Sequence, residues 1–506
     1  MKVLHTVELL PWGRTLQAEA GTPLADLLFP VGVEFPCGGR GKCRGCRVKL
    51  LDGTLPPTPE EKSLLGTAAL DEGWRLSCRH TVQGPLKLEL AQWETAILLD
   101  DSPLKFVPQE GLGIAVDVGT TTLAVQLVDM ETGNVLGVQT ALNPQARHGA
   151  DIMSRVDFAL TDHGADTLRR LIRQEVGEMI LKVMNDAQTN FARLRRVALV
   201  GNTVMHHLFG GLDLAPLAHF PFEPKCDGVL LFSPPELDWP FPSSVSVAFL
   251  PCLGGFVGSD ILAGLLATGL VEQDNLGLLV DLGTNGEMAI GNRDGLLYAS
   301  TAAGPAFEGA RISCGMRAAA GAVSSVTVVD GKLKCHVIGS VPPRGVCGSG
   351  LVDAVAGALD LKWIAPSGRL LCEPHLPLTP QLHLTQQDVR ELQLAKGAIA
   401  AGIHLLLQQL KTDLANLKRV WLAGAFGNYI SRASAQRIGL LPFPPEKVTP
   451  AGNTALRGAK MALFDWDAVL AGFPELRKKC RHISLHECPG FEETFAEAMT
   501  FPAATA

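Results

Sequence analysis

One strand–turn–strand pattern occurs twice in this chain, and it constrains the fold more than any other feature. The segment GIAVDVGTTTLAVQLVD at residues 113–129 is echoed by LLVDLGTNGEMAI at residues 278–290. In both segments an apolar strand ends in Asp-x-Gly-Thr, and a second apolar strand follows. A duplicated hairpin of this kind predicts two related lobes of alternating strands and helices that face each other across a cleft.

The Asp-x-Gly-Thr turn has a direct chemical use. The buried strand brings its aspartate to the mouth of the hairpin, where a carboxylate can hold Mg²⁺ through water. The glycine lets the backbone approach a phosphate closely, and successive N–H groups and hydroxyls can donate to its oxygens. We therefore expect Asp117 and Asp281 to flank one triphosphate. One of them would lie near the metal, and the other would orient the attacking water.

A third signal follows at residues 419–428, RVWLAGAFGN, where an apolar strand breaks into a predicted glycine turn. The turn from Gly424 to Gly427 would give a flat backbone surface against which an adenine ring can lie. One Asp-x-Gly-Thr motif is a weak signal, because ordinary hairpin turns share it. Two such motifs in order, followed by this turn, are a strong one.

The first part of the chain carries a different chemistry. The loop PCGGRGKCRGC at residues 36–46 spaces three thiols as C-x5-C-x2-C, and Cys78 follows at a distance. The plant-type ferredoxin spacing is C-x4-C-x2-C with a distant fourth cysteine, so this loop is longer by one residue. The pattern predicts that a [2Fe–2S] cluster is held by Cys37, Cys43, Cys46 and Cys78. The remaining cysteines have no tight ligand spacing and are interpreted mostly as small buried apolar residues.

The pattern of elements divides the chain into three parts. Residues 1–90 are predicted to form a small α+β domain of the β-grasp ferredoxin type, from strands at 3–7, 14–18, 46–51 and 86–90 and a helix at 22–28. Residues 91–110 mix isolated apolar groups, prolines and a charge pair, as a linker does. From residue 111 to 506, strands and helices alternate in the manner of a two-lobed α/β ATPase domain.

Composition excludes some classes of function. The net charge is −7 and the isoelectric point is near 6.0, so there is no electrostatic reason to expect nucleic acid or an anionic membrane as partner. No apolar run reaches the ~18 residues that a membrane span needs. The N-terminal residues lack the pattern of a secretory signal, so a cytoplasmic protein is expected.

The two phosphate motifs and the glycine turn resemble those of the superfamily that contains actin, sugar kinases and chaperone ATPases. Four longer stretches, at residues 143–155, 200–207, 302–311 and 345–351, resemble one family within it. That family is the reductive activators of corrinoid proteins, in which a [2Fe–2S] domain is joined to an actin-like ATPase. The likeness covers the first 90 residues and nearly everything after residue 111.

The resemblance implies a repair activity. Such an activator passes one electron from its cluster to an inactive Co(II) corrinoid and regenerates Co(I), while it hydrolyses ATP with Mg²⁺. It implies a corrinoid methyl-transfer protein as partner, a low-potential electron donor, and a possible homodimer. By the same carry-over, the cysteines named above hold the cluster. The phosphate motifs comprise Asp117, Gly119, Thr120, Thr121, Asp281, Gly283, Thr284 and Asn285, and the adenosine motif comprises Gly424 and Gly427.

Better known members of the family have a longer linker and an extra domain between the ferredoxin and the ATPase, whereas here only residues 91–110 separate them. The comparison with those members therefore predicts that a middle domain is missing, and a short tether restricts how far the cluster can swing. Asn202 and Thr203, which follow a predicted strand, are further candidates to reach the phosphate cleft.

Two other functions remain open at this point. One is an ATP-driven electron activator of a different low-potential enzyme, such as the activators of acyl-CoA dehydratases. The other is a corrinoid-protein binding partner that senses oxidation state with little turnover. A simple sugar kinase is a weaker interpretation, because the ferredoxin domain would then have no role.

Overall fold

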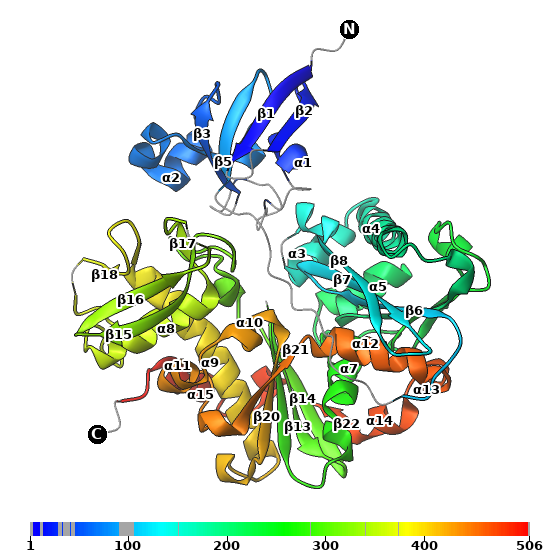
Figure 1. Cartoon of the computed structure of the whole chain (residues 1–506). Helices are drawn as coiled ribbons and strands as arrows, with labels where there is room; N and C mark the ends of the chain where they lie inside the picture. Colours follow the sequence, from blue (N-terminus) through cyan, green and yellow to red (C-terminus); the bar gives the residue numbers. More distant parts are fainter. Residues whose placement is uncertain are drawn as a thin grey trace.

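The computed structural model describes residues 4–10, 14–28, 33, 41, 46–90, 106–149, 151–283, 285–339, 341–372 and 374–503. A small N-terminal domain lies above two larger lobes that stand side by side (Figure 1). Of the predicted site residues, Cys37, Cys43 and Thr284 lie outside the described residues, as does most of the predicted linker.

The N-terminal domain is a five-stranded sheet that holds two helices. The strand order is β2-β1-β5-β3-β4, in which β1 and β5 are parallel and the other neighbours antiparallel. Its elements are β1 (Leu4–Leu10), β2 (Arg14–Glu19), α1 (Leu24–Leu28), β3 (Arg47–Asp52), α2 (Pro59–Asp71), β4 (Trp74–Leu76) and β5 (Leu86–Leu90). Alternate strand residues such as Val7, Leu9 and Leu88 are fully buried and form its core.

Helix α2, which the sequence analysis did not predict, begins with a capping box. Thr58 accepts a hydrogen bond from the Glu61 N–H, and the Glu61 carboxylate accepts one from the Thr58 N–H at 2.7 Å. Glu61 is fully buried, and it also accepts bonds from the Leu76 N–H at 2.6 Å and from His80 at 2.8 Å. This one carboxylate therefore ties the helix to strand β4 and to the short 3₁₀ turn η2 (Ser77–Arg79).

The first lobe is built on a six-stranded sheet of order β10-β11-β9-β6-β7-β8. Its strands are β6 (Leu112–Val118), β7 (Thr122–Asp129), β8 (Val135–Leu142), β9 (Leu194–Val200), β10 (Leu230–Phe232) and β11 (Ser246–Phe249). Its helices are α3 (Ile152–Ala159), α4 (Gly164–Asp186), α5 (Thr203–Gly210) and α6 (Ala215–Ala218). The apolar runs of β6 and β9 are buried on both faces, as is typical of central strands.

The second lobe repeats this plan with a sheet of order β21-β20-β12-β13-β14-β22. Its strands are β12 (Gly277–Leu282), β13 (Gly286–Asn292), β14 (Gly295–Thr301), β20 (Arg419–Ala423), β21 (Val448–Gly452) and β22 (Cys480–His482). In both lobes a three-strand antiparallel meander joins a parallel strand at its first member, β9 beside β6 and β20 beside β12. The predicted duplication is therefore present in the strand order.

The second lobe carries further elements around this sheet. A three-stranded sheet joins β15 (Ala322–Val329), β16 (Lys332–Val337) and β17 (Gly345–Val346), and β18 (Leu376–Pro377) pairs with β19 (His383–Leu384). The helices are α8 (Gly348–Asp360), α9 (Gln386–Gln409), α10 (Gly424–Tyr429), α11 (Arg432–Arg437), α14 (Pro474–Lys479) and α15 (Phe491–Met499). Helix α13 (Trp466–Ala471) instead packs against the first lobe, because Trp466 and Val469 share a buried cluster with β6 and β9.

Two helices pack against each other between the lobes. They are α7 (Ser259–Thr268), which follows the first lobe, and α12 (Thr454–Phe464), which follows strand β21 of the second. A Cβ at Gly458 would lie 2.1 Å from the Ala263 carbonyl oxygen, so this glycine permits the close approach of the two helices. Residues of both helices share a buried cluster with the first-lobe strands β6 and β9, which makes this pair the junction of the two lobes.

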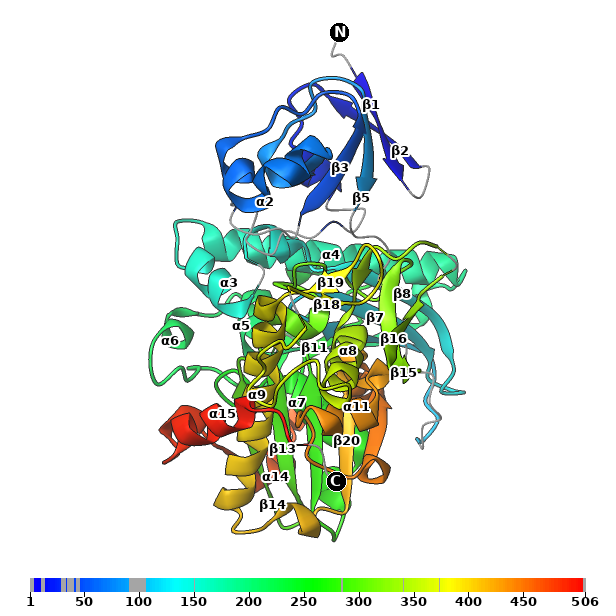
Figure 2. The ribbon, with the colours of Figure 1, turned by 90° about the vertical axis from the view of Figure 1, so that its left-hand side faces the viewer.

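The N-terminal domain touches both lobes (Figures 1 and 2). Asp26 of helix α1 lies 3.9 Å from Arg147 of the first lobe, and Glu89 of β5 lies 3.1 Å from Arg344 of the second. Ala146 of the first lobe and Ala320 of the second pack against the apolar core of the small domain. The domain thus spans the two lobes on one side of the molecule.

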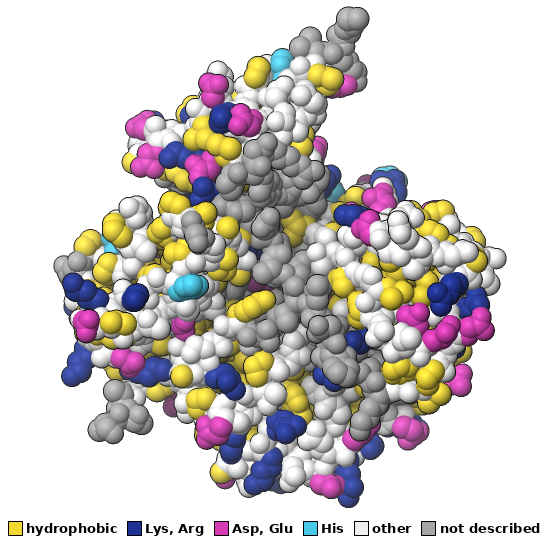
Figure 3. All heavy atoms as spheres, in the orientation of Figure 1, with side chains coloured by type: hydrophobic (Ala, Val, Ile, Leu, Met, Phe, Trp, Pro, Cys, Tyr) yellow, Lys and Arg dark blue, Asp and Glu magenta, His cyan; other side chains and the backbone are white. Residues whose placement is uncertain are grey.

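These observations confirm the predicted fold class of a β-grasp domain joined to a two-lobed actin-like domain. One local prediction is wrong: strand β20 leads directly into helix α10, where a flat glycine turn was expected. The domain boundaries at residues 90 and 111 stay a prediction, although β5 ends at Leu90 and β6 begins at Leu112. Acidic and basic side chains are intermixed over the face shown in Figure 3. In the described part of the chain, no helix combines the length and the apolar character that crossing a bilayer requires.

Candidate functional site

The two aspartates predicted from the repeat end the equivalent strands of the two lobes. Asp117 lies near the end of β6, and Asp281 near the end of β12. The Asp117 carboxylate accepts a hydrogen bond of 2.9 Å from the side-chain amide of Asn453. Asn453 caps helix α12, where its other side-chain atom accepts from the Leu456 N–H at 2.8 Å. An aspartate of the first lobe is therefore oriented by a cap that follows a strand of the second.

Two further acids join this pair, and the sequence analysis did not predict them. Glu287 lies directly opposite Asp281 in the β12–β13 hairpin, and its side chain is almost fully buried. Asp260 lies in the first turn of helix α7 and accepts a hydrogen bond from the Ile261 N–H at 2.8 Å. The four carboxylates Asp117, Asp260, Asp281 and Glu287 are called the acidic group below.

Burial raises the pKa of every member of the acidic group, and the neighbouring acids add to this rise for Asp260, Asp281 and Glu287. Burial raises the pKa of Asp117 to about 6, and the hydrogen bond from Asn453 partly opposes that rise. Burial, then the charges of Asp260 and Asp117, raise the pKa of Asp281 to about 7. Burial is also the main cause of the raised pKa of Asp260 and Glu287, with smaller contributions from the neighbouring acids. A divalent cation would relieve this repulsion. Among the described residues, no three His, Cys, Asp or Glu side chains lie close enough together to hold a metal ion directly, so Mg²⁺ would be held through water.

The loop after Asp117 is a tight turn. A Cβ at Gly119 would lie 2.4 Å from the Thr122 carbonyl oxygen, so only glycine fits this position. The Thr120 hydroxyl accepts a hydrogen bond of 2.8 Å from the Asn202 side-chain amide. Asn202 caps helix α5 and contacts this loop through that bond, whereas the Thr203 hydroxyl donates to the Gly254 carbonyl oxygen at 2.7 Å. A role of either residue in phosphate binding stays a prediction. Thr121 belongs to the same turn, and residues 119–121 are called the first loop below.

The second loop, at residues 283–285, is its counterpart after Asp281. The Gly283 N–H donates to the Asn285 carbonyl oxygen at 3.0 Å. The Asn285 side chain makes a hydrogen bond to Glu287 that partly opposes the raised pKa of that acid. The second loop is therefore connected to the acidic group through Asn285.

The third motif lies against the second. Gly424 begins helix α10 with a φ of +85°, and a Cβ there would lie 2.6 Å from Oδ1 of Asp281. A Cβ at Gly427 would lie 2.9 Å from the Leu422 side chain. The ring of Phe426, on the same helix, stacks on that of Phe307 with centroids 4.6 Å apart. The three predicted motifs therefore converge, although the last is a helix start with a close glycine contact instead of a flat turn.

The described cysteines of the predicted cluster set also come together. Cys46 is buried in the core of the small domain, and Cys78 lies half-buried in η2. Ser77 joins the two segments, because its N–H and its hydroxyl both donate to the Cys46 carbonyl oxygen, at 3.0 and 2.9 Å. Two thiols from distant parts of the sequence thus lie on adjacent backbone segments, as a shared cluster requires.

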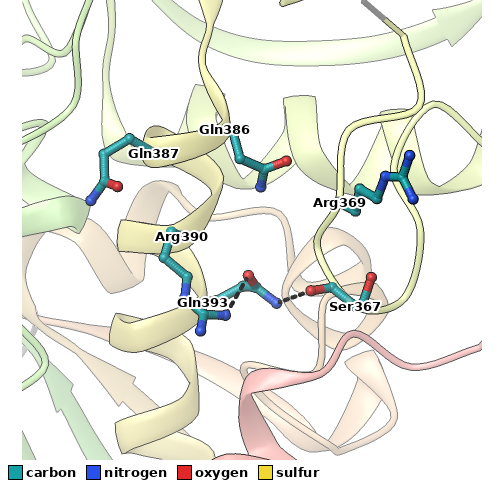
Figure 4. Close-up of a pocket in the computed structure, with 6 residues that line it drawn as sticks. All are labelled: Ser367, Arg369, Gln386, Gln387, Arg390 and Gln393. Atoms are coloured by element: carbon teal, nitrogen blue, oxygen red, sulfur yellow. Dashed lines mark hydrogen bonds between the residues drawn. The ribbon is translucent and has the colours of Figure 1, made fainter.

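A separate pocket of about 260 Å³ lies at the start of helix α9 (Figure 4). It is lined by Ser367, Arg369, Gln386, Gln387, Arg390 and Gln393. The Gln393 amide donates to the Ser367 carbonyl oxygen at 3.1 Å and accepts from Arg390 at 3.4 Å. None of the lining residues belongs to the acidic group or to the two loops, and these bonds fasten the 367–369 loop to the helix.

Comparison with known proteins matches three consecutive family descriptions to this chain. Residues 7–83 match the 2Fe-2S iron-sulfur cluster binding domain, residues 112–273 the RACo middle region, and residues 275–506 the C-terminal ASKHA domain of RACo. The corrinoid activation enzyme RamQ of Eubacterium limosum is 35% identical over 416 residues, which is 76% of this chain and 69% of that protein.

The chain belongs to the family of reductive activators of corrinoid proteins. The [Co(II) methylated amine-specific corrinoid protein] reductase of Methanosarcina barkeri is 30% identical over 70% of each chain. The solved structure of a reductive activator for a corrinoid iron–sulfur protein covers 99% of both chains with a TM-score of 0.70 and 26% identity. The domain matches of this chain support an iron–sulfur cluster in its ferredoxin domain and nucleotide binding by its ASKHA domain.

One expectation drawn from the family resemblance is wrong. The middle region of the family is present, since it matches residues 112–273, and it forms the first lobe and helix α7 of this structure. The sequence analysis had counted those residues as part of the ATPase and concluded that a middle domain was missing. The short connection itself remains, because β5 ends at Leu90 and β6 begins at Leu112.

Asp260, Glu287 and Asn453 are the candidate functional residues that sequence reasoning missed. Glu287 was within reach, because it lies inside the second repeat at the position that a tight hairpin pairs with Asp281. Asp260 and Asn453 carry only helix-start signals in the sequence. Their approach to the cleft depends on the packing of α7 against α12, which no local pattern encodes.

Proposed function

We propose that this protein is an ATP-dependent reductive activator that returns the Co(II) form of a corrinoid methyl-transfer protein to Co(I). The observation that carries the proposal is the union, in one chain, of a cysteine-bearing ferredoxin domain with two lobes whose equivalent strands bring carboxylates into the acidic group. The names of the relatives support a corrinoid protein as the partner. A low-potential donor would resupply the electron, and a homodimer is part of the same proposal.

Cys37, Cys43, Cys46 and Cys78 would hold a [2Fe–2S] cluster. The buried Cys46 and its link through Ser77 to the Cys78 turn fit this set, because they fix two ligands on adjoining backbone segments. The cluster supplies one electron per transfer, which suits the one-electron step from Co(II) to Co(I). The protein's own contribution is to hold the two described ligand segments rigidly and to shield Cys46 from water.

Asp117 and Asp281 would position Mg²⁺ and the attacking water around the phosphates of ATP. The N–H groups and hydroxyls of Gly119, Thr120 and Thr121, and of the second loop (Gly283, Thr284 and Asn285), would donate to phosphate oxygens. Hydrolysis joins a water oxygen to the γ-phosphorus and breaks the bond to ADP, so one proton of that water needs an acceptor. Asp281 suits this role, because burial holds the pKa of its carboxyl above the ordinary value, which favours acceptance of a proton.

Gly424 and Gly427 would contact the adenosine part of the nucleotide. The close approach of Gly424 to Asp281 supports this role, because it sets the start of helix α10 beside the acidic group. An adenosine held there would leave its phosphates directed to the two loops.

The decisive experiment is optical and anaerobic. Chemically reduced protein is mixed with a Co(II) corrinoid methyl-transfer protein, with and without Mg-ATP, and the Co(I) absorbance is followed. Co(I) that appears with Mg-ATP and not without it supports both the activity and its dependence on ATP. The Asp117→Ala variant serves as control, because it keeps the cluster domain unchanged. Intact cluster and measurable ATPase activity without any Co(I) would refute the corrinoid partner and favour another low-potential target.

A further inference from the structure

Residues 143–155, here called the clamp segment, link the first loop to the ferredoxin domain. The segment contains the 3₁₀ turn η3 (Pro144–Arg147) and the first half of helix α3. Its residues Asn143 and Arg155 are both fully buried, which is costly for polar side chains unless they are bonded. Nothing in the proposed chemistry above uses either residue.

Asn143 and Arg155 bind three consecutive carbonyl groups of the first loop. The Asn143 side-chain amide donates to the Gly119 carbonyl oxygen at 2.9 Å, and the Arg155 guanidinium donates to that of Thr120. The Asn143 backbone N–H donates to the Thr121 carbonyl oxygen, also at 2.9 Å. Every carbonyl of the first loop is therefore held by the clamp segment.

These hydrogen bonds to the carbonyl groups also determine the direction in which the N–H groups of the first loop point. In a planar trans peptide the N–H points away from the carbonyl of the same unit. The N–H groups of Thr120 and Thr121 therefore point away from the clamp segment, on the side where a phosphate oxygen can accept from them. The Thr120 hydroxyl already accepts from Asn202, so its own proton is available to the same phosphate.

The charge of Arg155 points to the same ligand. Its partners are the Thr120 and Gly149 carbonyl oxygens, the Gln145 side-chain oxygen and the Met205 sulfur. Among the described residues, no carboxylate lies within ion-pair distance of it. Burial lowers the pKa of Arg155 to about 9, and the charge of Asp151 offsets only part of this effect. A buried cation without a paired anion is unfavourable, and a phosphate bound on the far side of the first loop would compensate it.

The clamp segment meets the ferredoxin domain on its other side. Arg147, in η3, lies 3.9 Å from Asp26 of helix α1, and Ala146 packs against the apolar core that includes Cys46. In Figure 1, helix α1 lies above helix α3 of the first lobe. One short segment therefore binds the first loop with two side chains and touches the cluster domain with two others.

We propose that Asn143 and Arg155 are positioning residues for the nucleotide phosphates, and that the clamp segment couples phosphate binding to the docking of the ferredoxin domain. This inference rests on the proposed ATP binding at the first loop. A phosphate that orders the first loop favours one arrangement of the clamp segment. The docked ferredoxin domain also favours one arrangement of the clamp segment. Phosphate binding and domain docking therefore change each other's equilibrium constant by the same factor.

The positioning role is tested with Asn143→Asp and Arg155→Lys in the full-length holoprotein. The first change replaces a donor to the Gly119 carbonyl by an acceptor, and the second keeps the charge but removes the forked donor geometry. Both variants are expected to bind Mg-ATP at least about tenfold more weakly by calorimetry, which is about 1.4 kcal/mol. Circular dichroism and the visible cluster spectrum report folding. Arg169→Lys, on the exposed face of α4, is the matched control.

The coupling is tested from the ferredoxin side, where the ATPase lobes stay unaltered. Asp26→Lys places a cation beside Arg147, and Asp71→Lys makes the same charge reversal at the exposed end of α2. We expect Mg-ATP to change the hydrogen exchange of residues 24–28 in the wild type and in Asp71→Lys, and to change it by less than half as much in Asp26→Lys.

The outcomes separate this inference from the proposed function. A wild type that binds no ATP refutes the proposed function and the inference together. If the wild type binds ATP but both clamp variants retain its affinity, the positioning role is refuted alone. An exchange response in Asp26→Lys equal to that of Asp71→Lys refutes the coupling.

Discussion

Replacing Asp281 by asparagine should stabilise the nucleotide-free and metal-free protein while it abolishes ATP hydrolysis. Asp281 is half-buried beside Asp117, Asp260 and Glu287, and none of the described residues donates a hydrogen bond to its carboxylate. An amide of the same shape removes one charge from this crowded group. Function and stability are therefore expected to move in opposite directions at this position.

The size of the effect follows from the pKa of Asp281. Its rise from an ordinary 3.8 to about 7 corresponds to about 4 kcal/mol, and solvent screening of a half-buried group reduces this to about 2 to 4 kcal/mol. Because the folded protein holds the proton more tightly than the unfolded chain, the wild type loses stability as the pH rises from 3.8 to about 7. Above that range the stabilisation that comes from the Asp281 proton is completely lost. The advantage of the variant should therefore be largest near about pH 8 and roughly half as large near about pH 5.5.

The assay is anaerobic guanidinium unfolding, followed by circular dichroism and tryptophan fluorescence, at both pH values and without divalent cations. Asp294→Asn, in the exposed turn between β13 and β14, is the matched control and should leave the unfolding midpoint unchanged. Added Mg²⁺ should stabilise the wild type more than the variant, because the cation offsets the same repulsion. A variant no more stable than the wild type near pH 8, or an advantage that does not shrink at the lower pH, would refute the reasoning.

Three further changes test the site. Asp117→Ala should lower Mg²⁺-dependent phosphate release at least about 100-fold in a steady-state assay, and full activity would contradict the proposed cleft. Cys46→Ser should alter the visible cluster spectrum while nucleotide binding by calorimetry persists; an unchanged spectrum would remove Cys46 from the ligand set. Gly424→Ala should weaken ATP binding at least about tenfold, because its Cβ would lie 2.6 Å from Asp281 at a φ of +85°. Gly472→Ala has a similar φ of +74° but open space around it, so it should retain ATP affinity, and equal affinity in both variants would contradict the contact.

The parts of the fold that the sequence predicted are those encoded by local patterns. The two Asp-x-Gly-Thr hairpins could be recognised because each consists of an apolar strand, a tight turn and a second strand within about twenty residues. The long helix α9, Gln386–Gln409, is also encoded by a local pattern. Its apolar residues recur at helical spacing, and Thr385 caps its first turn.

Helix α2 was missed although its signal is local. The run Thr58-Pro-Glu-Glu61 combines a capping residue, a proline at the first helical position and the glutamate of a capping box. For helix α10 the local signal was misleading: two glycines in four residues favour a turn, and a turn was predicted where the helix begins. The packing of Gly424 against Asp281 and Leu282 holds that segment as a helix start. In this second case tertiary contact decided what local preference could not.

The acidic group shows why half of a site can escape a sequence analysis. Asp117 and Asp281 lie in repeated motifs, whereas Asp260 and Asn453 begin helices that have no counterpart in the repeat pattern. They reach the cleft only because α7 and α12 pack closely at Gly458 and Ala263, which brings their first turns towards the ends of β6 and β12. The positions of these two residues are therefore determined by the close packing of two helices that lie far apart in the sequence.

The contacts of the ferredoxin domain restrict how the two lobes can move while that domain stays docked. Asp26 and Glu89 belong to one small domain with a continuous sheet and core, so the distance between them is nearly fixed. Their partners Arg147 and Arg344 belong to different lobes. A rotation of one lobe against the other changes the separation of these two arginines, and at least one of the two ion pairs must then lengthen. We therefore expect docking of the cluster domain to depend on the relative arrangement of the lobes, and a ligand that favours one lobe arrangement to change the stability of the docked domain.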